Sequence, residues 1–207
     1  MAAIIFDFDG TIADSYDYFL TFLAREAGKK PLTDNQKAEF HGLSLVRMTR
    51  KMGVSWLRLP RMLYKCRQEM NPAMKHVKPF PGMPEVIRKL HKQGHQLYIL
   101  STNSMLNVEK FLKHQGLDSY FTEIYGGAGL FGKAPALKRL LLEQHIETRK
   151  AVYVGDEVRD AEAAQTIGIR IVTVTWGFAH ADELKDLKPT GVAHSPEDIV
   201  DILTPPV

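Results

Sequence analysis

The second half of the chain alternates short apolar runs with helical segments, and this alternation constrains the fold more than any other feature. The runs that we predict to be strands are residues 96–100, 123–125, 151–154 and 169–174. The segments that we predict to be helices are residues 84–93, 105–115, 135–145 and 158–167. Strands and helices in alternation over this length predict an α/β fold, a Rossmann-like parallel sheet with helices on both faces.

One more apolar strand, residues 3–8, lies at the start of the chain, far from the other strands in sequence. Residues 15–78 separate it from them and have the pattern of broken helices. The first of these helices is expected to start at Asp14-Ser15, with one of the two side chains as its cap. We therefore predict a catalytic core made of residues 1–14 and 79–207, interrupted by an all-helical cap domain at residues 15–78.

Length and composition limit the class of protein. A chain of 207 residues with 44% hydrophobic residues suffices for one sizeable core with a smaller insertion. No apolar run approaches the ~20 residues that span a bilayer, and the first ten residues do not have the pattern of a signal peptide. Cys66 is the only cysteine, which excludes an internal disulfide and fits a reducing compartment. We expect a cytoplasmic protein without a membrane partner.

Polar residues follow the predicted strands where each strand ends. Asp7 and Asp9 end the first strand, and residues 101–103, Ser-Thr-Asn, follow the next. Asp156 and Asp160 follow the strand at 151–154, and Lys133 precedes the helix at 135. In open parallel sheets ligands bind beyond the carboxyl ends of the strands, so we expect these groups to meet at one edge.

Several carboxylates at one edge repel each other unless a cation or a proton offsets their charge. Magnesium is the usual cation where oxygen ligands meet a phosphorylated substrate. The hydroxyls and Lys133 would then face the phosphate oxygens. Each group alone also has an ordinary explanation as a turn, a helix cap or a surface lysine, so the prediction depends on their order and common location.

The ordered set resembles the motifs of the haloacid dehalogenase superfamily of hydrolases. The matching segments are residues 6–11 (Phe-Asp-Phe-Asp-Gly-Thr), residues 100–103 (Leu-Ser-Thr-Asn), Lys133, and residues 155–160 (Gly-Asp-Glu-Val-Arg-Asp). The resemblance spans essentially the whole chain, including the inserted helical cap. Within the superfamily the chain looks most like the phosphoglycolate phosphatase group, because of residues 14–15, 79–82, 102–103 and 175–178.

The resemblance implies a role for each matching residue. Asp7 is the expected nucleophile, and Asp9 the expected general acid and base. Asp9 also argues against carbon–halogen chemistry, because family members with that activity lack a carboxyl group there. Thr102 and Asn103 are expected to bind the transferring phosphoryl group, with Ser101 as the alternative hydroxyl, and Lys133 to neutralise phosphate and Asp7. Asp156, Asp7 and the backbone carbonyl of Asp9 would hold Mg²⁺, and Asp160 would orient Lys133 or metal-bound water.

The predicted cap is expected to choose the substrate. Residues 47–78 carry nine basic residues and one acidic residue, which favours an anionic partner. Ser44 and Arg47 are the cap residues expected to contact the substrate.

We therefore expect a magnesium-dependent phosphatase acting on a small phosphomonoester, with phosphoglycolate as one candidate beside sugar phosphates and nucleotide monophosphates. A sugar phosphomutase and a non-catalytic binding module are the alternatives. The basic segment lacks a nucleic-acid motif, which disfavours a nucleic-acid partner, and the sequence leaves the oligomeric state open.

Overall fold

A six-stranded parallel sheet forms the centre of the molecule. The computed structural model describes residues 1–40, 42–43, 45–129, 132–178 and 187–204. The sheet has the order β5-β4-β1-β6-β7-β8. Its strands, in chain order, are β1 (Ala3–Phe6), β4 (Gln96–Leu100), β5 (Glu123–Tyr125), β6 (Ala151–Gly155), β7 (Arg170–Val174) and β8 (Gly191–Ala193).

Strand β1 lies inside the sheet, paired with β4 on one side and β6 on the other. Its residues face alternate sides, so that Ile4 and Phe6 enter one hydrophobic cluster while Ala3 and Ile5 enter the other. All four residues of the strand are buried. This burial on both faces explains why the strand is a continuous apolar run in the sequence.

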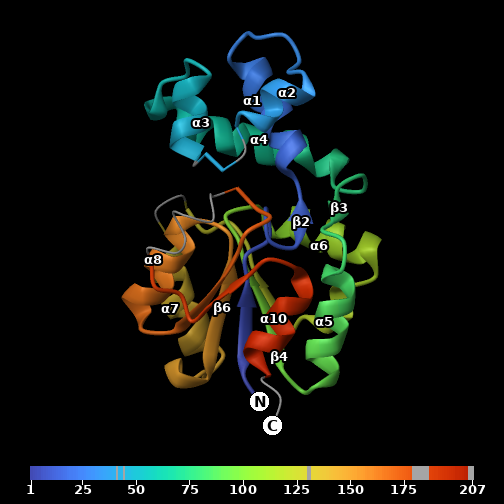
Figure 1. Cartoon of the computed structure of the whole chain (residues 1–207), viewed down its shortest axis with the longest axis vertical. Helices are drawn as coiled ribbons and strands as arrows, with labels where there is room; N and C mark the ends of the chain where they lie inside the picture. The colour runs from blue at the N-terminus through green and yellow to red at the C-terminus, as the bar shows by residue number, and fades with distance from the viewer. Residues whose placement is uncertain (41, 44, 130–131, 179–186, 205–207) are drawn as a thin grey trace.

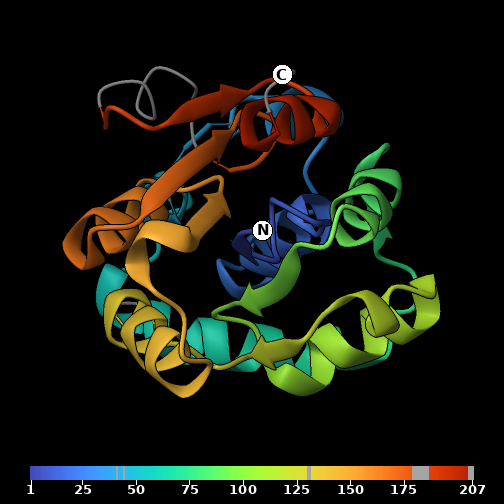
Figure 2. The ribbon, with the colours of Figure 1, turned by 90° about the horizontal axis from the view of Figure 1, so that it is seen from below.

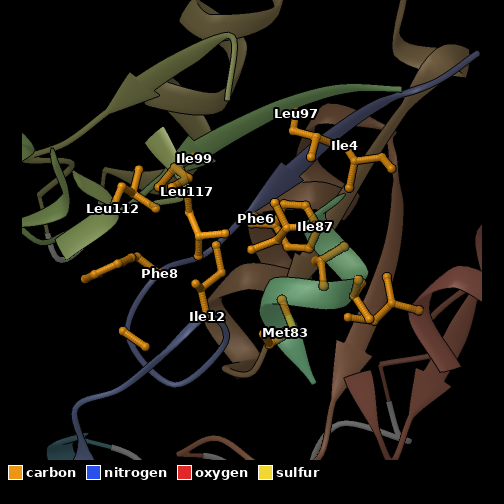
Figure 3. Packing of buried hydrophobic residues seen from close by; sticks show 14 of the residues in the cluster. Ile4, Phe6, Phe8, Ile12, Met83, Ile87, Leu97, Ile99, Leu112 and Leu117 are labelled. Carbon is orange, nitrogen blue, oxygen red and sulfur yellow. The ribbon is translucent and has the colours of Figure 1, made fainter. Parts of the chain in front are cut away.

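Helices cover both faces of the sheet (Figure 2). The cluster around Ile4 includes residues of α5 (Met83–Lys92), α6 (Met105–Gln115) and α10 (Pro196–Leu203). The opposite cluster includes residues of α7 (Lys133–Glu143) and α8 (Val158–Ile167). Figure 3 shows part of the first cluster, in which side chains of β1 meet those of α5. This arrangement confirms the predicted fold class.

The described helices between residues 16 and 73 form a separate group beyond the carboxyl edge of the sheet (Figure 1). We call this group the helical block. It consists of α1 (Tyr16–Glu26), α2 (Asp34–Ala38), α3 (Leu45–Lys51), the short 3₁₀ turn Trp56–Arg58 and α4 (Leu59–Ala73).

The chain leaves for the helical block after β2 (Ala13–Asp14) and returns through β3 (Lys78–Pro79). These two strands pair antiparallel, with Ala13 opposite Pro79. The division into a core and a cap domain at residues 14 and 79 stays a prediction.

Several element limits differ from those expected. Helix α7 begins at Lys133 and therefore includes it in the first turn, where Pro135 is tolerated because the N–H groups there have no partner within the helix. Strand β8 and helix α10 were not predicted; the strand is only three residues long and mostly half-buried.

Ser15 was expected as a candidate cap of the first helix, but its side chain makes no cap hydrogen bond. Its hydroxyl donates to Asp9 instead. Separately, none of the helices in the described ranges is long and apolar enough to cross a bilayer.

Candidate active site

A buried ion cluster lies where β1 and β6 end. The Lys133 ammonium contacts Oδ2 of Asp7 at 2.7 Å and also forms an ion pair with Asp160. All three side chains are almost fully buried. Burial opposes the charge of Lys133, but the carboxylates of Asp160 and Asp7 outweigh it and raise the pKa of this lysine. The lysine is therefore a fixed positive charge beside Asp7.

Burial raises the pKa of Asp7 to about 7, against the attraction of the Lys133 ammonium. Asp7 stands at the end of the central strand, where its own N–H donates to the carbonyl of Val154 at 2.8 Å. The backbone of the predicted nucleophile is thus held by the sheet. Its side chain points into the cluster rather than into solvent.

Asp7, Asp156 and Asp160 can each place one carboxylate oxygen so that all three oxygens lie within 4.8 Å of each other. Burial, followed by the nearby carboxylates of Glu157, Asp7 and Asp160, raises the pKa of Asp156 well above its usual range. Arg159 pairs with Glu157, and the single ammonium of Lys133 does not offset the three remaining carboxylates of Asp7, Asp156 and Asp160. A hard divalent cation with oxygen ligands would. The donor set therefore fits Mg²⁺. Both oxygens of Asp160 already accept hydrogen bonds, from Lys133 and from the Glu157 N–H.

Asp156 is oriented by two neutral donors. The Thr11 hydroxyl donates to its Oδ1 at 2.9 Å, and the Phe178 backbone N–H donates to its Oδ2 at 2.7 Å. Gly10 and Gly177 approach the same carboxylate so closely that a Cβ at either position would collide with it. Glycine is therefore required at both positions by the packing of Asp156, and Gly10 also has a positive φ of 83°.

Two side-chain hydrogen bonds hold the Asp9 carboxyl group in place. Its Oδ1 accepts from the Ser15 hydroxyl at 2.7 Å, and its Oδ2 accepts from the Asn103 amide at 3.0 Å. Desolvation raises the pKa of Asp9, although both hydrogen bonds act in the opposite direction. Burial thus favours the protonated form of Asp9, and a protonated carboxyl group on a cavity wall can act as a general acid toward a bound ligand.

The two candidate hydroxyls after β4 have different surroundings. Ser101 is fully buried, and its hydroxyl accepts the Asn103 backbone N–H at 2.9 Å. Thr102 is half-buried and lines the cavity beside Asp9. These surroundings favour Thr102 as the group that meets a ligand.

A chain of amide hydrogen bonds connects Asp9 with the helical block. The side-chain oxygen of Asn103, Oδ1, accepts from the Asn107 side-chain amide at 2.9 Å. The same amide donates to the backbone carbonyl of Arg67 on α4 at 2.8 Å, and Asn71 of α4 donates to Asn107 at 2.8 Å. The position of α4 is thereby coupled to the residue that orients Asp9.

A cavity of about 60 Å³ lies between Asp9 and the helical block. Its polar wall includes Asp9, Ser15, Thr102, Asn103, Arg67 and Arg159. Sequence reasoning assigned no site role to Ser15, Arg67 or Arg159. Ser15 was interpreted as a helix cap, and Arg67 was one of nine basic residues in a segment whose orientation the sequence did not fix.

The two predicted cap contacts are placed differently. Ser44 lies outside the described residues. Arg47 is an exposed residue of α3 and is not among the residues that line the cavity. The structure thus brings together the predicted residues from the strand ends, while Arg67 of α4, and not Arg47, is the arginine of the helical block that lines the cavity.

Comparison with known proteins gives a consistent picture. A family model described as haloacid dehalogenase-like hydrolase matches residues 4–174. A phosphoglycolate phosphatase of Synechococcus elongatus is 33% identical over 207 residues, which covers 99% of this chain and 98% of that protein. A 5'-nucleotidase of Pseudomonas aeruginosa is 29% identical over 115 residues, or 55% of this chain.

Solved structures agree on the fold. A haloacid dehalogenase-like hydrolase, SP0104 from Streptococcus pneumoniae, superposes with a TM-score of 0.80 at 22% identity, with 99% of both chains covered. A structure described as a predicted phosphoglycolate phosphatase from Haemophilus somnus gives a TM-score of 0.75 at 21% identity, covering 99% of this chain and 98% of that one. At these identities the likeness is one of fold.

Proposed function

Because the chain belongs to the haloacid dehalogenase-like hydrolase family and is a phosphatase of that family, we propose that it hydrolyses a small phosphomonoester through a phosphoryl group carried on Asp7. The observation that carries this proposal is the buried pair of Asp7 and Lys133 at the end of the central strand, with Asp9 on the wall of the adjoining cavity.

In the first step an Asp7 carboxylate oxygen attacks phosphorus, and the bond between phosphorus and the ester oxygen breaks. Asp9 donates its proton to the departing oxygen, so the leaving group departs as an alcohol. The Lys133 ammonium offsets charge on Asp7 and on the phosphoryl oxygens. Thr102 donates a hydrogen bond to the same oxygens.

In the second step a water molecule attacks phosphorus, and the bond to Asp7 breaks. Asp9, now a carboxylate, takes the proton of that water and is ready for the next cycle. Ser15 and Asn103 hold the Asp9 carboxyl group in place through both steps. Phosphate is released and Asp7 is regenerated.

Asp7, Asp156 and the backbone carbonyl of Asp9 would hold Mg²⁺, and Asp160 would orient Lys133. When bound, the cation supplies positive charge that offsets the phosphate oxygens and the crowded carboxylates. Thr11 and the Phe178 N–H orient the Asp156 carboxylate.

We propose phosphoglycolate as the first substrate to test. The relative from Synechococcus elongatus, which is similar along its whole length, supports this choice. A cavity of about 60 Å³ beside Asp9 also favours a short leaving group. By comparison, one water needs about 10–15 Å³ of such volume.

The test is phosphate release from a panel of phosphomonoesters, with and without Mg²⁺. We expect release to require Mg²⁺ and to fall by about 10³-fold or more in Asp7→Asn, because the amide cannot attack phosphorus. Asp118→Asn makes the same change at an exposed position and should retain full activity.

Absence of turnover on the whole panel by folded, Mg²⁺-loaded protein would overturn the proposal. Phosphoryl transfer between two positions of a sugar phosphate would then be the next activity to measure. Full activity of Asp7→Asn would leave hydrolysis intact but exclude Asp7 as the nucleophile.

A further inference from the structure

The cavity beside Asp9 is the place where the leaving group of the substrate must lie. Asp9, the proposed proton donor to the ester oxygen, is on its wall. The rest of the wall is largely apolar, with Phe19, Leu63, Met70 and Phe178. Charges that face such a wall interact more strongly than charges in water, because the surroundings are poorly polarisable. Whatever charged groups the cavity contains therefore influence which leaving group is accepted.

Arg159 enters this cavity from the first turn of α8. One guanidinium nitrogen, Nη2, pairs with Oε1 of Glu157. Its Nε and Nη1 are buried and have no hydrogen-bond partner within the described ranges. A buried donor without a partner loses its hydrogen bonds to water and gains none in return, so two such donors on one side chain require an explanation.

Arg67 enters the same cavity from the helical block. The structure gives its guanidinium no hydrogen bond or ion pair to any described residue, whereas its backbone carbonyl is anchored by Asn107. Burial lowers the pKa of Arg67, and the charge of Arg159 adds to this effect while Asp9 opposes it. The positive charges of the two arginines therefore repel each other across the cavity, and an anion bound between them would relieve this repulsion.

The charges on the cavity wall do not balance, and one more negative charge would neutralise them. Arg67 and Arg159 contribute two positive charges, and Glu157 contributes one negative charge. Asp9 is neutral when it acts as the proton donor. Before the ester bond breaks, the wall thus carries one unbalanced positive charge.

We propose that Arg67 and Arg159 form an oxyanion subsite for the leaving group, so that the enzyme selects short phosphomonoesters with a second anionic group close to the ester oxygen. The inference rests on the proposed function and deepens it, because it assigns substrate choice to one arginine of α4 and one of α8. A carboxylate or a second phosphate has the required chemistry. Arginine binds both through charge-assisted hydrogen bonds.

The experiment compares three substrates that differ in one group, namely 2-phosphoglycolate, 2-hydroxyethyl phosphate and 1,2-ethanediol bisphosphate. We expect wild-type kcat/KM for an anionic substrate to exceed that for 2-hydroxyethyl phosphate by about 100-fold, from two charge-assisted hydrogen bonds. The better of the two anionic substrates identifies the second group. Arg67→Gln should reduce this preference by about 10-fold or more, mainly through KM, and Arg67→Lys should restore part of it.

Arg61→Gln is the matched control, because Arg61 is an exposed arginine of the same helix outside this cavity. It should keep the wild-type preference. Arg159→Gln should lower the preference as Arg67→Gln does. A wild type without preference for the anionic substrates, or a loss in Arg67→Gln that is equal for all three, would overturn the subsite.

A binding measurement tests the arginine subsite separately from the proposed phosphatase activity. Calorimetric titration of 2-phosphoglycolate into Asp7→Asn protein measures the subsite without turnover, and adding Arg67→Gln should weaken Kd by about 10-fold or more. Arginine-dependent binding without hydrolysis by the wild type would refute the phosphatase proposal alone. If the wild type hydrolyses 2-phosphoglycolate but Arg67→Gln leaves its Kd unchanged, the subsite alone would be refuted.

Discussion

At the scale of single residues, the orientation of Asp156 depends on two donors that carry no charge. One is the Thr11 hydroxyl and the other is the Phe178 backbone N–H. Groups that orient a metal ligand commonly affect metal affinity by about 10–100-fold. Thr11 is fully buried, so water does not replace its hydroxyl if the hydroxyl is removed.

We expect Thr11→Val to raise the Mg²⁺ concentration at half-maximal activity by about 10-fold, because valine keeps the shape and removes the donor. A titration of activity against Mg²⁺ measures this shift. Thr21→Val, on the exposed face of α1, serves as the control and should leave the Mg²⁺ dependence in place. An unchanged Mg²⁺ requirement in Thr11→Val would contradict the assignment of Asp156 as a ligand.

The residues at strand ends could be located from sequence because the topology of a parallel sheet decides where they go. Asp7, Asp156 and Asp160 meet for this reason. The cavity residues Arg67 and Arg159 could not be located in the same way. Whether a basic side chain on a helix faces solvent or the site depends on how that helix packs, and the helical block packs through long-range contacts that the local pattern does not encode.

At the scale of elements, helix α10 is fixed at its start by a capping box. Asp198 accepts the backbone N–H groups of His194 and Ser195, and also the Ser195 hydroxyl. These three donors stabilise the carboxylate and lower the pKa of Asp198. The charged form is thus favoured in the folded state.

Because the folded pKa is lowered, this contribution is fully present above the unfolded pKa of about 3.9 and is lost as the pH falls through the folded pKa. We expect Asp198→Asn to lower the free energy of unfolding by about 1 kcal/mol at pH 7. The difference from wild type should shrink in urea unfolding series taken toward pH 3. Asp201→Asn changes an acid on the same helix that is not part of the box, and it should have little effect. If the difference in the free energy of unfolding between wild type and Asp198→Asn grew toward acid pH, the capping role of the Asp198 carboxylate would be refuted.

Long periodic elements were predicted with limits close to those observed; of the three-residue strands, β5 was predicted at its observed limits and β8 was not predicted. Strand β4 coincides with the predicted segment because it is a continuous apolar run, and helices α6 and α8 do so because apolar spacing and a following glycine define them. Strand β8 is held by its pairing with β7, and nothing in the sequence of its three residues predicts this long-range pairing. Helix α10 begins at a proline after a serine, a start signal that would have been sufficient.

At the scale of the whole molecule, β1 lies inside the core, with a strand on each side and a hydrophobic cluster on each face. Ile5 of this strand is fully buried in the cluster with α7 and α8. Truncating such a side chain loses its burial and leaves a cavity, since the neighbours come from several elements and relax only partly.

We expect Ile5→Ala to lower the free energy of unfolding by about 2–5 kcal/mol, and Tm by about 10 °C for a chain of this size. Differential scanning calorimetry measures both. Leu142→Ala removes a comparable side chain that is 66% exposed and should shift Tm by less than about 2 °C. Equal shifts in the two variants would contradict the placement of β1 at the centre.

The pairing of β2 with β3 has a consequence for how such a molecule can evolve. The chain departs for the helical block and returns from it at positions that face each other across one ladder, Ala13 opposite Pro79. Neighbouring strands lie only about 5 Å apart, so a replacement of almost any length could be spliced between them without moving the sheet. The helical block, which borders the cavity beside Asp9, could therefore be exchanged as a unit while the residues at the strand ends stay in place. New specificities can arise in such a lineage without reinventing its chemistry.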